Sequence, residues 1–122
     1  MLPNEVGGLV TTLPEEVPGQ LALLIGRYEG GPRAFEDIVD LHYRFERIHP
    51  FQDGNGRIGR MVLFKECLRN GVLPFIVPDD RKHFYYRGLA NYEDEPGWLL
   101  DTCRAFQDDF AARFLPVVPH LA

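Results

Sequence analysis

The chain has 122 residues, which fits one compact domain, because a domain usually has ~100–150 residues. Its apolar fraction of 45% and charged fraction of 25% are typical of a soluble globular protein and exclude intrinsic disorder, collagen and a disulfide scaffold. The net charge of −5 repels a phosphate backbone and excludes a general nucleic-acid binder, while leaving room for a small local anion site.

The first predicted element is a short β-hairpin within residues 2–17. The pair Gly7-Gly8 can supply the positive φ of a tight turn, and the β-favouring residues 9–13 follow it. From Pro18 a helix is predicted through Tyr28, and the sequence Glu29-Gly30-Gly31-Pro32 ends it.

Two amphipathic helices are predicted next. The first runs over residues 34–48 and ends because Pro50 forces His49 out of the helical region. The second starts near Asn55 and ends at Asn70-Gly71. Apolar residues at helical spacing form a stripe on each helix. The stripe of the first helix consists of Ala34, Ile38, Leu41, Phe45 and Ile48, widened by Phe35, Val39 and His42. The stripe of the second helix consists of Ile58, Met61, Val62, Phe64 or Lys65, and Leu68.

In the last third of the chain, the residue pattern predicts an extended connection over residues 73–78, followed by two more helices. Asp79 or Asp80 can cap a helix through Tyr92, and a final helix follows residues 95–97. Cys67 and Cys103 each lie in a helical apolar pattern, which favours buried free thiols over a disulfide. With no repeat and no linker, the chain reads as a single, mainly α-helical domain.

The sequence predicts neither a membrane span nor an export signal. No apolar run approaches the ~20 residues that a membrane span needs. The N-terminus lacks the basic and then apolar layout of a signal peptide. We therefore expect a cytoplasmic protein with no membrane partner.

The chemistry concentrates in residues 49–60, between the two amphipathic helices. Gly54 and Gly56 leave backbone N–H groups unshielded at a helix start, which makes an anion site. Arg57 and Arg60 lie three residues apart, so both guanidinium groups can bind phosphate oxygens.

Two further groups of this loop have complementary chemistry. Asp53 can hold a divalent cation that bridges phosphates, and His49 can accept a proton near neutral pH. A purely structural interpretation is that both residues cap helices and that the arginines are solvated surface charges. The combination of three complementary groups in one tight loop favours function.

A dinucleotide site is a competing interpretation of the same loop. Residues 54–59 match the pattern G-x-G-x-x-G, and Asp79 and Asp80 follow about twenty residues later. That pattern must follow a β-strand, whereas the preceding residues have helical spacing and end at His49-Pro50. A nicotinamide site is therefore disfavoured.

Residues 49–60 resemble the signature of the Fic (Fic/Doc) family, H-P-F-x-D/E-G-N-G-R with a second arginine three residues later. Every defined position is present, and the resemblance extends upstream through residues 41–48 and downstream to Tyr85-Tyr86. It implies a single Fic domain over residues 1–122, with residues 1–17 as a β-hairpin flap and residues 18–122 as a helical core. The abrupt start at the flap favours a chain that lacks the upstream helices of a longer protein.

The resemblance implies a protein adenylyltransferase, which transfers AMP from Mg-ATP to a Ser, Thr or Tyr hydroxyl and releases pyrophosphate. His49 would then take the proton of the attacking hydroxyl, and Asp53 would hold Mg²⁺. The amides around Gly54 and Gly56, together with Asn55, would bind the α phosphate of the nucleotide. Arg57 would bind the β phosphate, and Arg60 would bind the γ phosphate.

The resemblance also implies partners outside the loop. Tyr85 and Tyr86 match a position that lines the nucleobase pocket in relatives, although a tyrosine pair on an amphipathic helix is equally typical of a core. The flap, from Val6 to Leu13, would bind the target protein by main-chain pairing. No inhibitory Ser/Thr-x-x-x-Glu-Gly/Asn segment is evident, so inhibition would come from an antitoxin or an inhibitory helix outside this chain.

Three alternatives stay open at this stage. A Fic-type phosphotransferase would transfer the γ phosphate, but such relatives usually have Lys where Gly56 stands; other donors and removal of AMP are further variants. A non-catalytic interaction module would display the flap, but would be expected to lose His49, Asp53 or an arginine. A structural metal site is disfavoured because the four histidines and two cysteines show no paired ligand spacing.

Overall fold

The computed structural model describes residues 5–6, 9–29, 33–49 and 55–114 of the chain. Its elements confirm the mainly α-helical class that the periodicity predicts. In chain order they are β1 (Glu5–Val6), β2 (Leu9–Val10), the short 3₁₀ helix η1 (Pro14–Glu16), α1 (Val17–Tyr28), α2 (Phe35–Ile48), α3 (Asn55–Arg69), the 3₁₀ helix η2 (Asp79–Arg81), α4 (Lys82–Ala90) and α5 (Pro96–Phe114).

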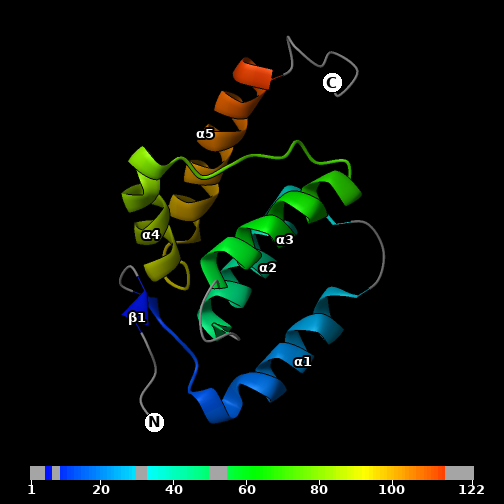
Figure 1. Ribbon diagram of the computed structural model, residues 1–122, viewed down its shortest axis with the longest axis vertical. Helices are drawn as coiled ribbons and strands as arrows, with labels where there is room; N and C mark the ends of the chain where they lie inside the picture. The colour runs from blue at the N-terminus through cyan, green and yellow to red at the C-terminus, as the bar shows by residue number, and fades with distance from the viewer. Residues whose placement is uncertain (1–4, 7–8, 30–32, 50–54, 115–122) are drawn as a thin grey trace.

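The pair α2 and α3 forms the centre of the molecule (Figure 1). Helix α1 packs against α2 on one side, while α4 and α5 pack against each other on the other side. The extended segment after α3 crosses above this helix to reach α4 (Figure 1). The loop over residues 49–55 therefore connects the two central helices, and its two ends are fixed by the packing of α2 against α3.

The boundaries of α2 follow the signals in the sequence. At its start, the Ala34 N–H donates a hydrogen bond of 3.0 Å to the carboxylate of Asp37. At its end, His49 has φ 53° and ψ 60°, in the left-handed region, and its N–H still bonds the Phe45 carbonyl at 3.1 Å. The helix thus ends at Ile48, and His49 lies outside the helical region, as Pro50 predicts.

The predicted N-terminal hairpin corresponds to an antiparallel pair of two-residue strands, β1 and β2. Glu5 pairs with Val10 and Val6 with Leu9, while the predicted turn residues Gly7 and Gly8 lie outside the described residues. After β2, the Thr12 N–H donates to the Arg47 carbonyl at 2.8 Å, which attaches this segment to the last turn of α2. Its role as a flap that binds a target stays a prediction.

The hydrophobic core lies between α2, α3, α4 and α5 and includes the segment that leads to α4. The two cysteines are buried in it as free thiols, as expected. Among the described residues no helix is long and apolar enough to cross a membrane. The core cluster consists of Ile38, Val39, Tyr43, Leu63, Cys67, Phe75, Val77, Tyr85, Leu89, Leu99, Cys103 and Phe106.

The predicted apolar stripe of α3 is wrong. Met61 is 65% exposed and Leu68 is 53% exposed, although both belong to that stripe. The buried face is instead formed by Asn55, Gly59, Leu63, Glu66 and Cys67. This face contains glycine and polar side chains, and a glycine lets α3 pack closely against α2. The mean hydropathy of such a face is too low for an apolar periodicity to identify it as the buried face.

The predicted stripe of α2 is confirmed at Ile38, Val39, His42 and Ile48 but not at its other positions. Ala34 is exposed, and Leu41 and Phe45 are only half-buried. The buried side chains are those of Ile38, Val39, His42, Tyr43, Glu46 and Ile48. The helix therefore turns a face containing three titratable groups, His42, Tyr43 and Glu46, toward its neighbours.

Candidate functional site

The two described ends of the predicted catalytic loop meet at one end of the central helix pair. His49 ends α2 and Asn55 begins α3, and these two helices pack side by side (Figure 1). The loop between them, with Asp53 and Gly54, lies outside the described residues. The structure thus brings together the predicted base and the predicted phosphate-binding turn, while the predicted metal ligand is not described.

His49 occupies an unusual backbone conformation at the end of α2. Its φ of 53° is the only positive φ among the described non-glycine residues. Such a conformation is uncommon for residues with a Cβ, although histidine adopts it more often than most, and it occurs preferentially at functional sites. The side chain is half-buried. This backbone conformation ends α2 at the residue predicted to act as the base.

The first turn of α3 has the features of an anion site. A helix of 15 residues presents unpaired N–H groups and positive potential at its N-terminus. Asn55 is buried there, and Arg57 is exposed. The Arg60 guanidinium lies over Gly56, so that a Cβ at Gly56 would be 2.9 Å from Arg60 Nη1. Gly56 therefore leaves room for a cation directly above the backbone of this turn.

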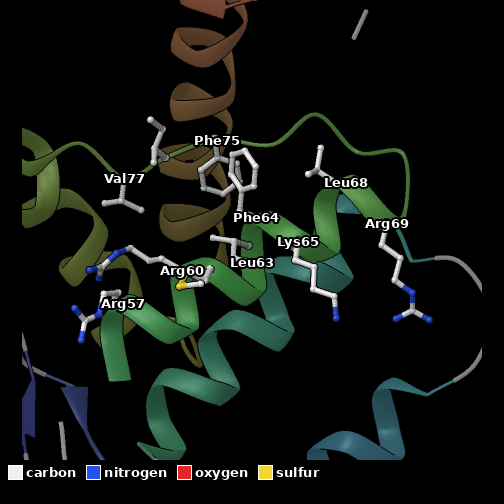
Figure 2. Close-up of a pocket in the computed structure, with 11 residues that line it drawn as sticks. Arg57, Arg60, Leu63, Phe64, Lys65, Leu68, Arg69, Phe75 and Val77 are labelled. Atoms are coloured by element: carbon white, nitrogen blue, oxygen red, sulfur yellow. The ribbon is translucent and has the colours of Figure 1, made fainter. Parts of the chain in front are cut away.

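A groove of about 760 Å³ begins at this turn and follows α3 (Figure 2). At its start Arg57 and Arg60 line it, and Lys65 and Arg69 line it further along α3 with their charged ends directed away from the segment that carries Phe75 and Val77. We call it the α3 groove. Its remaining lining is apolar and comes from α3 and the segment above it: Met61, Leu63, Phe64, Leu68, Phe75, Ile76 and Val77.

A chain of buried hydrogen bonds supports the site from below. His42 Nδ1 lies 3.2 Å from the Gly59 carbonyl, and His42 Nε2 is hydrogen-bonded to the Tyr85 hydroxyl. Burial lowers the pKa of His42 to about 4, so the ring is neutral at pH 7. Since a carbonyl only accepts, Nδ1 carries the proton, and the Tyr85 hydroxyl donates to Nε2. This chain links α4 through α2 to the motif segment of α3.

Glu46 lies one helical turn from His42 and also contacts Gly59. A Cβ at Gly59 would overlap Glu46 Oε1 and would lie 3.1 Å from Phe45 Cδ1, so a larger residue there requires the Glu46 side chain to move. The Glu46 side chain is 7% exposed, and its Oε1 is a buried oxygen without a hydrogen-bond partner in the described part of the chain. Burial raises the pKa of Glu46 to about 7, while the Arg60 cation acts in the opposite direction.

The predicted nucleobase residues differ in accessibility. Tyr85 is 1% exposed and belongs to the core, where burial raises its pKa well above the usual value. Its hydroxyl is used by His42, so Tyr85 does not line an open pocket, and that prediction needs correction. The core alternative applies because the helix turns this position inward. Tyr86 is half-buried beside it, with ring centroids 5.4 Å apart, and its role stays a prediction.

The sequence motif did not reveal that His42 and Glu46 support the site. The available signal is spacing, because Glu46 is four residues after His42, so the two share one face of α2. A glutamate on a face that is otherwise apolar is the second signal.

Among the described residues, no group of three or more His, Cys, Asp or Glu side chains could hold a metal ion.

Replacing Glu46 with glutamine should stabilise the fold in a pH-dependent way. The Glu46 pKa is raised in the fold from 4.5 to about 7, so the wild type loses stability as the pH rises across this window. Glutamine does not titrate, and its advantage in the free energy of unfolding should grow to about 2 to 3 kcal/mol above the window. Urea unfolding of both proteins at several pH values measures this difference. An advantage that stayed constant across the window would contradict the assignment.

Comparison with protein families identifies similar sequences. A family model described as the Fic/DOC family matches residues 3–66, a little over half of the chain. This region includes β1, β2, α1, α2, the loop and most of α3. The match therefore covers His49 and the complete first turn of α3.

Curated relatives cover a similar part of the chain. It is 35% identical over 77 residues to "Protein adenylyltransferase Fic" of Culex quinquefasciatus, which covers 57% of this chain and 15% of that relative. It is 38% identical over 88 residues to the protein of the same name of Drosophila erecta, which covers 63% of this chain and 18% of the relative. The chain thus spans less than a fifth of the length of these relatives.

Proposed function

This chain belongs to the Fic/DOC family, and on that premise we propose that it transfers AMP from ATP to a hydroxyl group of a target protein. The observation that carries the proposal is the junction of α2 and α3, where the residue predicted as the base adjoins a helix N-terminus with two arginines. Such a junction suits a reaction in which a nucleophile must be deprotonated beside a polyphosphate.

The proposed reaction is a displacement at the α phosphorus of ATP. The hydroxyl oxygen of a Ser, Thr or Tyr forms a bond to this phosphorus, and the bond from phosphorus to the bridging oxygen of the β phosphate breaks. His49 accepts the hydroxyl proton, and the electron pair of the broken bond leaves with pyrophosphate.

The phosphates would be bound by the first turn of α3 and the residues around it. The amides at Gly54 and Gly56 and the Asn55 side chain would stabilise the charge that develops on the α phosphate. Arg57 would bind the β phosphate and Arg60 the γ phosphate. Fixed donors at such positions are often the largest catalytic contribution, worth ~3–4 kcal/mol for one donor in a comparable oxyanion site.

Asp53 would hold Mg²⁺ beside the phosphates. The donor set fits this ion, because a magnesium site commonly combines one or two carboxylates with phosphate oxygens and water. When bound, Mg²⁺ neutralises phosphate charge.

The target protein would bind along the segment from Val6 to Leu13. This segment is attached next to the site, because Thr12 bonds Arg47 in the last turn of α2, two residues before His49. A target strand that pairs with this segment would carry its hydroxyl toward the base. Tyr86 stays the candidate for contact with the nucleobase, and inhibition would come from an antitoxin or inhibitory helix outside this chain.

Label transfer tests the proposal against its alternatives. The protein is incubated in Mg²⁺ buffer with ATP labelled at the α phosphate or at the γ phosphate, with itself and a cell lysate as acceptors. We expect protein-bound α label and free labelled pyrophosphate from the γ-labelled substrate. Bound γ label alone would show a phosphotransferase instead, and transfer of neither label would favour another donor or a binding module.

Replacing Arg60 with glutamine should weaken ATP binding about tenfold to a hundredfold, because a charge-assisted contact to the γ phosphate is lost. The affinity for AMP, which has no γ phosphate, should change little. Isothermal titration calorimetry with Mg-ATP and AMP measures both. The matched control is Arg113→Gln at the far end of α5, which should leave both affinities unchanged.

A further inference from the structure

Helix α1 is rich in apolar residues but buries few of them. It lies at the edge of the molecule, where it packs against α2 (Figure 1). Leu24 is its one buried residue, whereas Leu23 is 65% exposed. An apolar side chain contributes to stability in proportion to the area that it removes from water, so Leu23 contributes little to this fold. The proposed reaction gives the exposed face of α1 no role.

A hollow of about 510 Å³ borders the same face of α1. Its apolar lining includes Leu13, Leu24 and Ile48, and Leu23 lines it from α1. Gly19, one turn before Leu23, leaves further space, because a Cβ there would meet nothing within 4 Å. The face of α1 therefore offers both a projecting apolar side chain and room to receive one.

Opposite charges lie at the two ends of this face. Glu16 precedes α1, Arg27 lies in its last turn, and both line the hollow. Their spacing of eleven residues is close to three helical turns, so they share one face with Leu23 between them. Both are exposed, and neither forms a side-chain ion pair within the part of the chain that the structure describes. Such a face is complementary to itself when two copies run antiparallel.

We propose that two copies of this chain associate by packing α1 against α1 in antiparallel orientation. A two-fold axis then passes near the middle of the helix, so that each contact occurs twice. Glu16 of each copy lies opposite Arg27 of the other, and Leu23 of each copy fills the space over Gly19 of the other. This inference goes beyond the proposed function and does not depend on it.

The size of the face sets the expected strength of the dimer. A helix of 12 residues is about 18 Å long, so one face of α1 offers less than the ~800 Å² that each partner buries in a standard interface. We therefore expect a reversible dimer with a micromolar Kd. The hollow is also lined by Thr12 and Arg47, whose backbone hydrogen bond attaches the segment after β2 to α2. Association should shield this bond from water.

The first test is analytical ultracentrifugation over about 1 to 500 μM protein. The wild type should dimerise as its concentration rises, and Leu23→Asp should weaken dimerisation about a hundredfold or more, because a charge replaces an apolar contact that occurs twice. The matched control is Met61→Asp in the α3 groove, since Met61 is equally exposed and should not affect association. A wild type that stays monomeric throughout, or dissociation by Met61→Asp alone, would overturn the proposal.

The second test exchanges the charges at the two ends of the face. Arg27→Glu and Glu16→Arg each place like charges opposite each other twice in the dimer, and each should weaken it about tenfold. The double variant brings opposite charges together again and should dimerise within about threefold of the wild type. Circular dichroism checks that these exposed substitutions leave the fold intact. Weakening in the double variant equal to the product of the two single effects would rule out the antiparallel pairing.

Hydrogen exchange locates the interface without any substitution. The Thr12 amide and the amides of residues 13–24 should exchange more slowly at high than at low protein concentration, because the second copy covers them. Amides of residues 61–69 should exchange at the same rate at both concentrations. Concentration-dependent protection of residues 61–69 in place of residues 12–24 would assign association to the α3 groove and refute the α1 interface.

Discussion

Replacing His49 with alanine should lower the rate of AMP transfer by about 10²–10⁴-fold, because the hydroxyl nucleophile then has no positioned base. Binding of Mg-ATP should stay within about twofold of the wild type, because the proposed phosphate ligands are groups of residues 54–60 and do not include His49. Single-turnover transfer from α-labelled ATP, together with calorimetry, separates these two quantities. The expected signature is loss of the chemical step without loss of binding.

The backbone at His49 requires a matched variant, since its φ is 53°. Asparagine tolerates the left-handed region better than alanine but provides no base. His49→Asn should therefore be as inactive as His49→Ala while keeping more of the wild-type stability. Activity close to that of the wild type in either variant would show that His49 is not the base. Loss of ATP binding in both would instead indicate that the loop had changed its structure.

Replacing Gly88 with alanine should lower the free energy of unfolding by about 2 to 3 kcal/mol. Gly88 is buried where α4 crosses α5, and a Cβ there would lie 2.8 Å from the Leu99 Cα and 3.0 Å from the Leu99 nitrogen. Because these are backbone atoms of α5, the overlap is relieved only by separating the two helices. The better helix propensity of alanine, worth up to ~1 kcal/mol, offsets only part of this loss. Urea unfolding monitored by circular dichroism measures the change.

Gly26 provides the control for this substitution. It lies inside α1, is exposed, and a Cβ there would meet nothing within 4 Å. Gly26→Ala should therefore raise the free energy of unfolding by about 0.5 to 1 kcal/mol through helix propensity alone. Opposite signs for the two glycines are the expected result. Stabilisation by both would show that α4 and α5 do not approach as closely as described.

The helices could be predicted from the sequence because their signals are local. Pro50 ends α2, Asn70-Gly71 ends α3, and Pro96 starts α5, each within one or two residues of the predicted position. Such signals depend on backbone sterics and on N–H groups within one turn, so no distant residue can override them easily. The candidate base and the phosphate-binding turn were likewise predicted, because twelve consecutive residues contain them.

The faces that these helices bury were predicted less well. The stripe predicted for α3 placed Met61 and Leu68 in the core, whereas the contact with α2 is made through Gly59 and its neighbours. Periodicity detects a buried face only when that face is apolar, and this one contains a glycine and two polar side chains. Which face a helix buries depends on the shape of its neighbour.

The sequence by itself determined the helical class, the order of the elements and the residues of the loop that resemble the family signature. Only the tertiary structure decided that Tyr85 is a core residue bonded to His42, and that Glu46 lies against Gly59 beside Arg60. The reason is physical. Burial and charge coupling arise between side chains far apart in the sequence, and they form only when close packing of α2, α3 and α4 excludes water from the space between them.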